Sequence, residues 1–180
     1  PLLGGHHGAN DLARSLGETL SAQAAITTSG DVHFNIALDQ PPAGLALVNP
    51  EDAKGFMAKV LAGESIVAPS DNEWLGASNL PFADDGTLTI TITTEPIEGS
   101  ETHLIYAPQS LALGIGCERG TQVHEVITLV EKVLADNSLS SHAIGGIFSI
   151  DLKADEAALH ATAAHFDTRA RFFTRDELLE

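Results

Sequence analysis

The residues best suited to chemistry gather in three short stretches, each placed just before an expected helix. The first is 4–10, GGHHGAN. Glycines allow positive φ angles and let the backbone approach a ligand closely. The helix start that follows offers free N–H groups to a carboxylate or phosphate. His6 and His7 add imidazoles for proton transfer or metal ligation. The competing interpretation is a glycine-rich connector with exposed histidines.

The second stretch is 111–121, LALGIGCERGT. Gly114 and Gly116 end an apolar run, and Gly120 and Thr121 open a helical pattern. Open α/β sheets bind ligands at the carboxyl ends of their strands, which is where these glycines fall. The spacing is not the GxGxxG of dinucleotide-binding proteins, so the sequence argues against NAD. The alternative is simply a strand, a tight turn and a helix.

Two side chains in this second stretch carry chemistry. Arg119 has the planar fork that binds a carboxylate through two hydrogen bonds. Cys117, the only cysteine, lies near a helix start and is a candidate nucleophile. A lone cysteine more often serves as a small packing residue, and that interpretation stays open.

The third stretch is 149–156, SIDLKADE, again between a strand and a helix. Asp151, Lys153 and Asp155 alternate with apolar residues, so a continuing strand would place the charges on one side. Asp155 is expected to cap the helix, with Glu156 in its first turn. Asp151 and Lys153 form either a site pair or a surface ion pair, and surface pairs contribute little to stability.

Other reactive motifs are missing from the sequence. There is no HExxH, no GxSxG and no Walker loop. The histidines after residue 100 show no partners at metal-ligand spacing, so no metal site is predicted. Catalytic motifs alone therefore do not define a reaction.

Composition excludes several classes of protein. The 180 residues include 25 acidic and 9 basic side chains, which gives a net charge of −16. That balance argues against nucleic acid and against an anionic membrane surface as partners. A single cysteine excludes an internal disulfide, and no apolar run approaches the roughly 20 residues of a membrane span. No signal peptide is visible, so a cytoplasmic protein is expected; the start without methionine suggests a piece of a longer chain.

The elements that must position these stretches form an α/β pattern. Residues 1–30 indicate a loop, a helix capped by Asn10 or Asp11, and a strand at 24–28. Residues 31–109 indicate a small α+β unit with a helix from Asn49-Pro50 to Gly63. Its expected strands are 45–48, 65–69, 88–93 and 103–108.

From residue 110 the pattern is β-loop-α-β-α-β. The apolar strand 111–116 is expected to be a central one, buried on both faces, and Thr121 to cap the helix that follows. The fold class predicted is α/β, with two small α/β or α+β units. The later elements expected are a helix to about 135, a strand at 144–152, a helix at 155–166, a strand at 170–173 and a helix start at 174–180.

Taken in order, these stretches resemble one family. PLLGGHHGANDLARSLG and the following AITTSGD are similar to the glycine/His/Asn segment and strand of the CbiG proteins of cobalamin biosynthesis. LGIGCERGT and IDLKADEAAL resemble the paired hallmarks of the CbiG C-terminal domain, which stand-alone CobE proteins share. The resemblance divides the chain into the end of an N-terminal domain (1–30), a middle domain (31–109) and a truncated CobE-like domain (110–180). It implies a fragment or part of a fusion.

The resemblance implies a cobalt-precorrin-5A hydrolase, which opens the δ-lactone of its tetrapyrrole substrate and releases acetaldehyde. His6 or His7 is the best candidate for the base that activates water, and Asp151 or Glu118 is a weaker one. No cofactor of the protein's own is expected, since any cobalt comes with the substrate. The glycine-rich helix starts and Arg119 suit the carboxylate arms of the substrate. The expected binding residues are Gly4, Gly5, Gly8, Asn10, Gly114, Gly116, Cys117, Arg119, Gly120, Thr121 and Lys153.

Two alternatives to catalysis remain. A cleft between His6 and the loop Gly114–Gly120 could hold and transfer a labile corrinoid intermediate without chemistry. The chain could also be a scaffold fused to precorrin-3B C17-methyltransferase. The expected partners are the tetrapyrrole and other enzymes of corrin synthesis, without nucleic acid or membrane.

Overall fold

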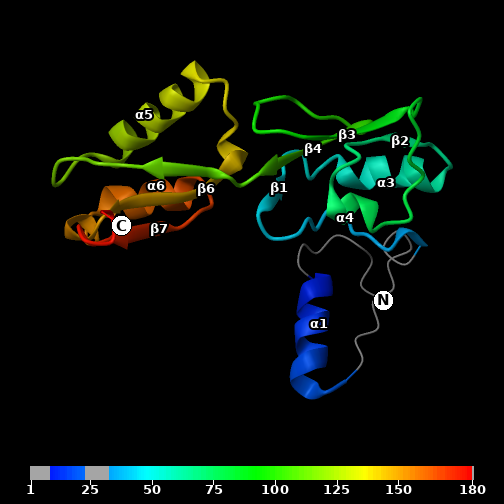
Figure 1. Ribbon diagram of the computed structural model, residues 1–180, viewed down its shortest axis with the longest axis horizontal. Helices are drawn as coiled ribbons and strands as arrows, with labels where there is room; N and C mark the ends of the chain where they lie inside the picture. The colour runs from blue at the N-terminus through cyan, green and yellow to red at the C-terminus, as the bar shows by residue number, and fades with distance from the viewer. Residues whose placement is uncertain (1–8, 23–32, 180) are drawn as a thin grey trace. The chain divides into compact units, whose positions relative to one another are not determined.

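The computed structural model describes residues 9–22 and 33–179 (Figure 1). The chain forms two compact units that interleave in sequence. Among the described residues, the first unit takes 9–22, 33–43, 47–92 and 98–106, and the second takes 44–46, 93–97 and 107–179. Strands and helices are mixed throughout, so the predicted α/β class with two small units is confirmed.

Helix α1 (Ala9–Leu20) is the first described element. It begins at Ala9, so Asn10 lies inside its first turn and the predicted cap position was wrong. Leu12, Leu16 and Leu20 recur every four residues and share one side of the helix, where they are 61%, 49% and 70% exposed. The residues Gly4, Gly5, His6, His7 and Gly8 and the expected strand at 24–28 lie outside the described residues.

Sheet A, most of which lies in the first unit, has the strand order β1-β4-β3-β2. Strands β2, β3 and β4 are parallel, with Ile66 opposite Leu88 and Ile90 opposite Leu104. All four strands expected in this region are confirmed. Their bounds are β1 Leu45–Leu47, β2 Ile66–Val67, β3 Leu88–Ile92 and β4 His103–Pro108.

In the core of the first unit, apolar residues of strand β3 alternate with threonines. Leu88 and Ile90 are buried, while Thr89 and Thr91 are half-buried. Helices α3 (Ala53–Leu61) and α4 (Glu73–Gly76) add buried apolar side chains. Tyr106 of β4 is buried and its hydroxyl donates to Leu38 O at 2.7 Å. Burial raises the pKa of Tyr106 above its usual range, so this hydroxyl stays a donor.

Asn49 does not cap a helix, which corrects the prediction for 49–63. Its Oδ1 accepts from Ile105 N at 3.0 Å, and its Nδ2 donates to His103 O at 3.2 Å and to Asp52 Oδ2 at 2.8 Å. The Asn49 side chain therefore bonds to strand β4 and to Asp52 rather than to a helix start. Helix α3 begins only at Ala53. The helix starts later because the buried amide must satisfy backbone groups of a distant strand.

The second unit is built on sheet B, in which β5, β6 and β7 lie in that order and are all parallel (Figure 1). Helix α5 packs against helix α6. The strands and helices expected after residue 110 are confirmed, except for a final helix: residues 175–178 form a turn. The bounds are β5 Leu111–Gly114, α5 Val123–Asp136, β6 Ile144–Ile150, α6 Ala157–His165 and β7 Ala170–Phe173.

Strand β5 lies at the edge of sheet B, and β6 is the central strand, which reverses the expectation for 111–116. The large residues of β5 point to one side only, and Ala112 and Gly114 on the other side are exposed. The packed side forms the α5 core cluster. It contains Val130, Leu134 and Ile144, with Leu111, Leu113, Ile115, Leu139 and Phe166 packed against them.

Candidate functional site

Two of the predicted stretches meet at the carboxyl edge of sheet B. Strands β5 and β6 are parallel neighbours, with Gly114 opposite Phe148. The loop after β5 and the segment after β6 therefore leave the sheet at the same edge. Two contacts close this end of the strands: Ile115 N donates to Phe148 O at 2.9 Å, and Ser149 Oγ donates to Ile115 O at 2.7 Å.

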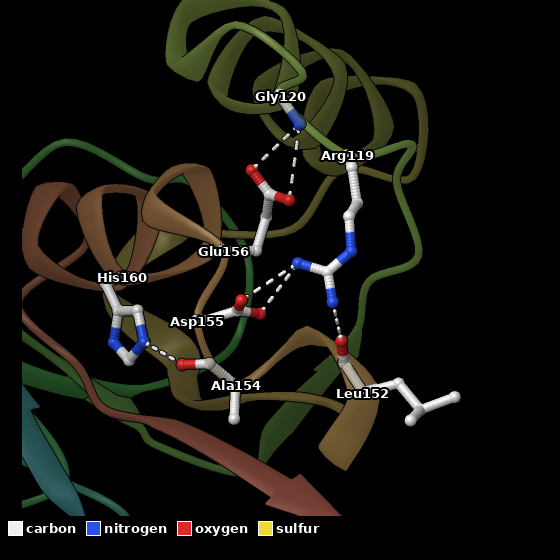
Figure 2. Close-up of polar contacts among 7 residues, drawn as sticks. All are labelled: Arg119, Gly120, Leu152, Ala154, Asp155, Glu156 and His160. Atoms are coloured by element: carbon white, nitrogen blue, oxygen red, sulfur yellow. Dashed lines mark hydrogen bonds and ion pairs between the residues drawn. The ribbon is translucent and has the colours of Figure 1, made fainter.

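Arg119 joins the two loops (Figure 2). Its Nη1 lies 2.9 Å from both carboxylate oxygens of Asp155, and its Nη2 donates to Leu152 O at 2.8 Å. The side chains of Arg119 and Asp155 are 63% and 71% exposed. Hydrogen bonding to Arg119 is the main reason why the pKa of Asp155 is held below its usual range.

Glu156 makes the second link between the loops (Figure 2). Both of its carboxylate oxygens lie 3.3 Å from Gly120 N, and the residue is only 7% exposed. Gly120 has φ +75°, a left-handed conformation that strongly favours glycine. The amide expected to receive a ligand's carboxylate is thus occupied by a carboxylate of the chain itself.

Two expected local roles are wrong at this edge. Thr121 does not cap α5, because its Oγ1 donates to Glu118 O at 2.8 Å and Gln122 takes the cap position. Asp155 does not cap α6 either, because Glu156 holds that position and Asp155 pairs with Arg119. A suitable side chain at a helix start is not enough to predict a cap, because here both side chains bond to loop residues instead.

The strand after β6 does not continue through the third stretch. Asp151–Lys153 form the short 3-10 turn η2, so the expected alternation of charges is lost. Asp151 is exposed, Lys153 is half-buried, and the structure forms no ion pair between them. His160 Nε2 lies 2.8 Å from Ala154 O, which ties this segment to α6.

The remaining predicted residues of the second unit lie along the loop after β5. Gly114 and Gly116 are exposed, and a Cβ built on either would meet no atom within 4 Å. Cys117 is half-buried. The sequence thus found the loop that carries Arg119 and Gly120. It did not find that Glu156 is their buried neighbour, because a glutamate at a helix start usually faces solvent.

Residues 9–22 and 33–179 contain neither a cluster suited to a metal ion nor a helix suited to cross a membrane. No group of three or more His, Cys, Asp or Glu side chains in these ranges is arranged to hold a metal ion. Among the same residues, no helix combines the length and apolarity needed to cross a membrane.

Comparisons with known protein families match two separate parts of the chain. The family model for the C-terminus of cobalamin synthesis G matches residues 111–180, which hold all of sheet B and both of its helices. The family model for the N-terminal part of cobalamin synthesis G matches residues 1–31. Sheet B and its carboxyl edge therefore lie in the part of the chain that matches cobalamin synthesis G. The chain is a member of the CbiG family.

Individual relatives give the same result. The chain is 27% identical over 201 residues to cobalt-precorrin-5A hydrolase of Priestia megaterium, which covers 98% of this chain and 54% of the relative. It is 28% identical over 197 residues to cobalt-precorrin-5A hydrolase of Salmonella typhimurium, covering 99% of this chain and 56% of the relative. The chain thus spans about half the length of these curated relatives.

Two shorter or looser similarities complete the comparison. Over 67 residues the chain is 42% identical to Protein CobE of a Sinorhizobium species, which covers 37% of this chain and 44% of the relative. A solved structure of a cobalamin biosynthesis protein G homolog from Sulfolobus solfataricus is 26% identical. It covers 100% of this chain and 54% of that chain, with a TM-score of 0.34.

Proposed function

We propose that the protein carrying this chain is a cobalt-precorrin-5A hydrolase of cobalamin biosynthesis. The observation that carries the proposal is the ordered match of both ends of the chain to cobalamin synthesis G. Two relatives that bear the name cobalt-precorrin-5A hydrolase align with 98% and 99% of the chain. Because the chain spans only about half of each, the proposed activity is that of the whole protein.

The proposed reaction needs a base and an acid. Water adds to the lactone carbonyl and the acyl C–O bond breaks, which leaves a free carboxyl and an oxygen that takes up a proton. The freed hydroxyl of the two-carbon unit then loses its proton and becomes the aldehyde carbonyl as the C–C bond to the macrocycle breaks. The macrocycle carbon keeps the electron pair of that bond and takes up a proton, and acetaldehyde departs. His6 or His7 is the proposed base for water. Asp151 and Glu118, both exposed near the carboxyl edge of sheet B, are weaker candidates.

Arg119 is the proposed anchor for one carboxylate arm of the substrate. An exposed ion pair contributes little to stability, so a ligand carboxylate can compete with Asp155 for the guanidinium. Lys153 lies next to Leu152, whose carbonyl is also bound to Arg119. Gly120 N is engaged by buried Glu156, so its proposed part is to fix the loop that presents Arg119.

The test is release of acetaldehyde from cobalt-precorrin-5A. The intact gene product and the 180-residue chain are incubated separately with the substrate. Acetaldehyde is measured by its reduction with alcohol dehydrogenase and NADH, and protein-free substrate is the control. We expect one acetaldehyde per macrocycle from the intact protein. Conversion at the protein-free rate by the intact protein would refute the proposed function.

Binding without turnover is a second candidate for residues 111–180 taken alone. The observation that favours it is that Arg119 and Glu156 are engaged in structural contacts rather than poised beside a nucleophile. Protein CobE is similar to this part of the chain over 67 residues. Retention of the macrocycle by the chain without acetaldehyde release, and loss of retention in Arg119→Ala, would favour this candidate.

A further inference from the structure

Sheet B has two faces with different surroundings. Leu113 packs into the α5 core cluster, so its side of the sheet faces the helices. The register pairs Leu113 with Ile147 and Ile147 with Ala170, which places all three on the helix face. Phe172 belongs to the same face, since its ring lies 5.3 Å from that of His160 in α6.

The next row of the register must point the other way, because side chains alternate along a strand. That row pairs Gly114 with Phe148 and Phe148 with Arg171. Helix α6 packs against α5, whose core cluster lies on the helix face, so neither helix covers this side. We call this side the open face. It consists of Ala112, Gly114, Gly146, Phe148, Ile150, Arg171 and Phe173.

The open face has a low, apolar floor. A Cβ on Gly146 would lie 2.9 Å from Phe148 Cζ, so the Phe148 ring rests over the glycine backbone. The rings of Phe148 and Phe173 have centroids 6.0 Å apart and planes inclined by 31°. Both side chains are half-buried, and above Gly114 there is open space. Such a floor offers aromatic surface to a broad, flat ligand.

Two arginines border this floor. Arg171 is exposed and shares its row with Phe148. Arg169 is exposed and extends the ladder by one residue, because its carbonyl accepts from Ile147 N at 3.0 Å. Within the described ranges neither arginine forms an ion pair. In a chain with 9 basic residues and a net charge of −16, this charge beside an apolar floor complements an acidic ligand.

We propose that the open face of sheet B binds the tetrapyrrole macrocycle through Phe148 and Phe173, with Arg169 and Arg171 holding carboxylate arms. Arginine suits this role because its planar fork binds carboxylates through paired hydrogen bonds. Gly114 and Ile150 end their strands just before the segments that carry Arg119 and Asp151. A ligand on the open face therefore extends to the carboxyl edge of the sheet. The choice of a tetrapyrrole rests on the proposed function.

The test is binding of uroporphyrin III, an octacarboxylate tetrapyrrole, to the full 180-residue chain, followed by porphyrin fluorescence. Arg171→Ala removes one carboxylate anchor, and we expect its dissociation constant to rise about tenfold. Gly114→Leu places a side chain in open space above the floor, and we expect a similar loss without unfolding. Lys132→Ala is the matched control, since it removes one positive charge from α5, on the other face. We expect binding within about twofold of wild type for this control.

Three outcomes would overturn the proposal. The first is wild-type affinity in both Arg171→Ala and Gly114→Leu, with circular dichroism showing both folded. The second is an equal loss in Lys132→Ala, which would indicate attraction by net charge alone. The third is a wild-type dimer that both variants convert to monomer in sedimentation experiments while binding is unchanged. That result would indicate that the open face binds a second copy of the chain rather than the tetrapyrrole.

The acetaldehyde assay separates this proposal from the proposed function. One outcome is that uroporphyrin binding depends on Arg171 while the intact protein releases no acetaldehyde. This result would support ligand binding at the open face and refute the proposed hydrolase activity. Acetaldehyde release with an unchanged KM in Arg171→Ala and Gly114→Leu would support the hydrolase and overturn the open face as its binding surface.

Discussion

Glu156 and Gly120 are held together by a carboxylate-to-amide contact in which both oxygens lie 3.3 Å from the backbone nitrogen. The two residues are 36 positions apart in the chain. Their contact fixes the loop after β5 to the start of α6, and so fixes the backbone that presents Arg119. Because Glu156 is almost fully buried, its polar carboxyl group needs this partner.

Replacing Glu156 should therefore destabilise the second unit. Glu156→Ala leaves the Gly120 N–H without its partner, and we expect the free energy of unfolding to fall by about 1–3 kcal/mol. Glu156→Gln keeps an acceptor oxygen and should lose less. Urea unfolding followed by circular dichroism measures the difference. Glu125→Ala, at an exposed position in α5, is the control and should stay within about 0.5 kcal/mol of wild type.

Gly120 and Gly114, at the two ends of the β5 loop region, should differ in their tolerance of alanine. Gly120→Ala forces a Cβ into a left-handed conformation, which should cost about 1 kcal/mol or more of unfolding free energy. Gly114→Ala meets no neighbouring atom and has no positive φ, so we expect a change within about 0.5 kcal/mol. Equal thermal shifts in the two variants would contradict the left-handed role of Gly120.

The pair of Arg119 and Asp155 should be visible in a carboxyl titration. The folded-state pKa of Asp155 is lowered, so its stabilising effect is present above the unfolded value of about 3.9 and is lost as pH falls through the lower folded value. We expect the NMR titration midpoint of the Asp155 carboxyl to lie below 3.9 in wild type. In Arg119→Ala it should rise toward the ordinary value. An identical midpoint in both proteins would show that the ion pair is not formed in solution.

His6 is expected to matter for turnover and not for binding. In the intact protein, His6→Ala should reduce acetaldehyde release about 100-fold or more, because general-base assistance of water is lost. Uroporphyrin III binding should be unchanged. His7→Ala is the matched comparison and should have the smaller effect. Unchanged turnover in His6→Ala would remove this residue from the mechanism.

Much of the local structure followed from sequence patterns alone. The alternation of Leu88 and Ile90 with threonines predicted β3 and its buried side, since a strand turns successive side chains to opposite faces. The helical spacing of Val126, Val130 and Leu134 likewise predicted α5 and its buried stripe. These patterns are local, and neighbouring residues suffice to set them.

Predictions from the sequence were wrong where a side chain bonds to a distant part of the chain instead of to its neighbours. Asn49 had the right type and position for a cap, but it bonds to strand β4, 54 and 56 residues later in the chain. The sequence 111–116 suggested a central strand because it is almost wholly apolar. Its place at the edge depends on which strands pair, and that is a property of the whole sheet.

By itself the sequence determined the α/β class, the acidic charge, the order of strands and helices after residue 110, and the family to which the chain belongs. Tertiary structure alone decided the partners of Arg119, Gly120, Asp155 and Glu156 and the exposure of one face of sheet B. The physical reason is that parallel pairing of β5 with β6 brings together loop residues that lie 33 to 36 positions apart in the chain. A pattern within either loop alone cannot predict contacts between the two loops.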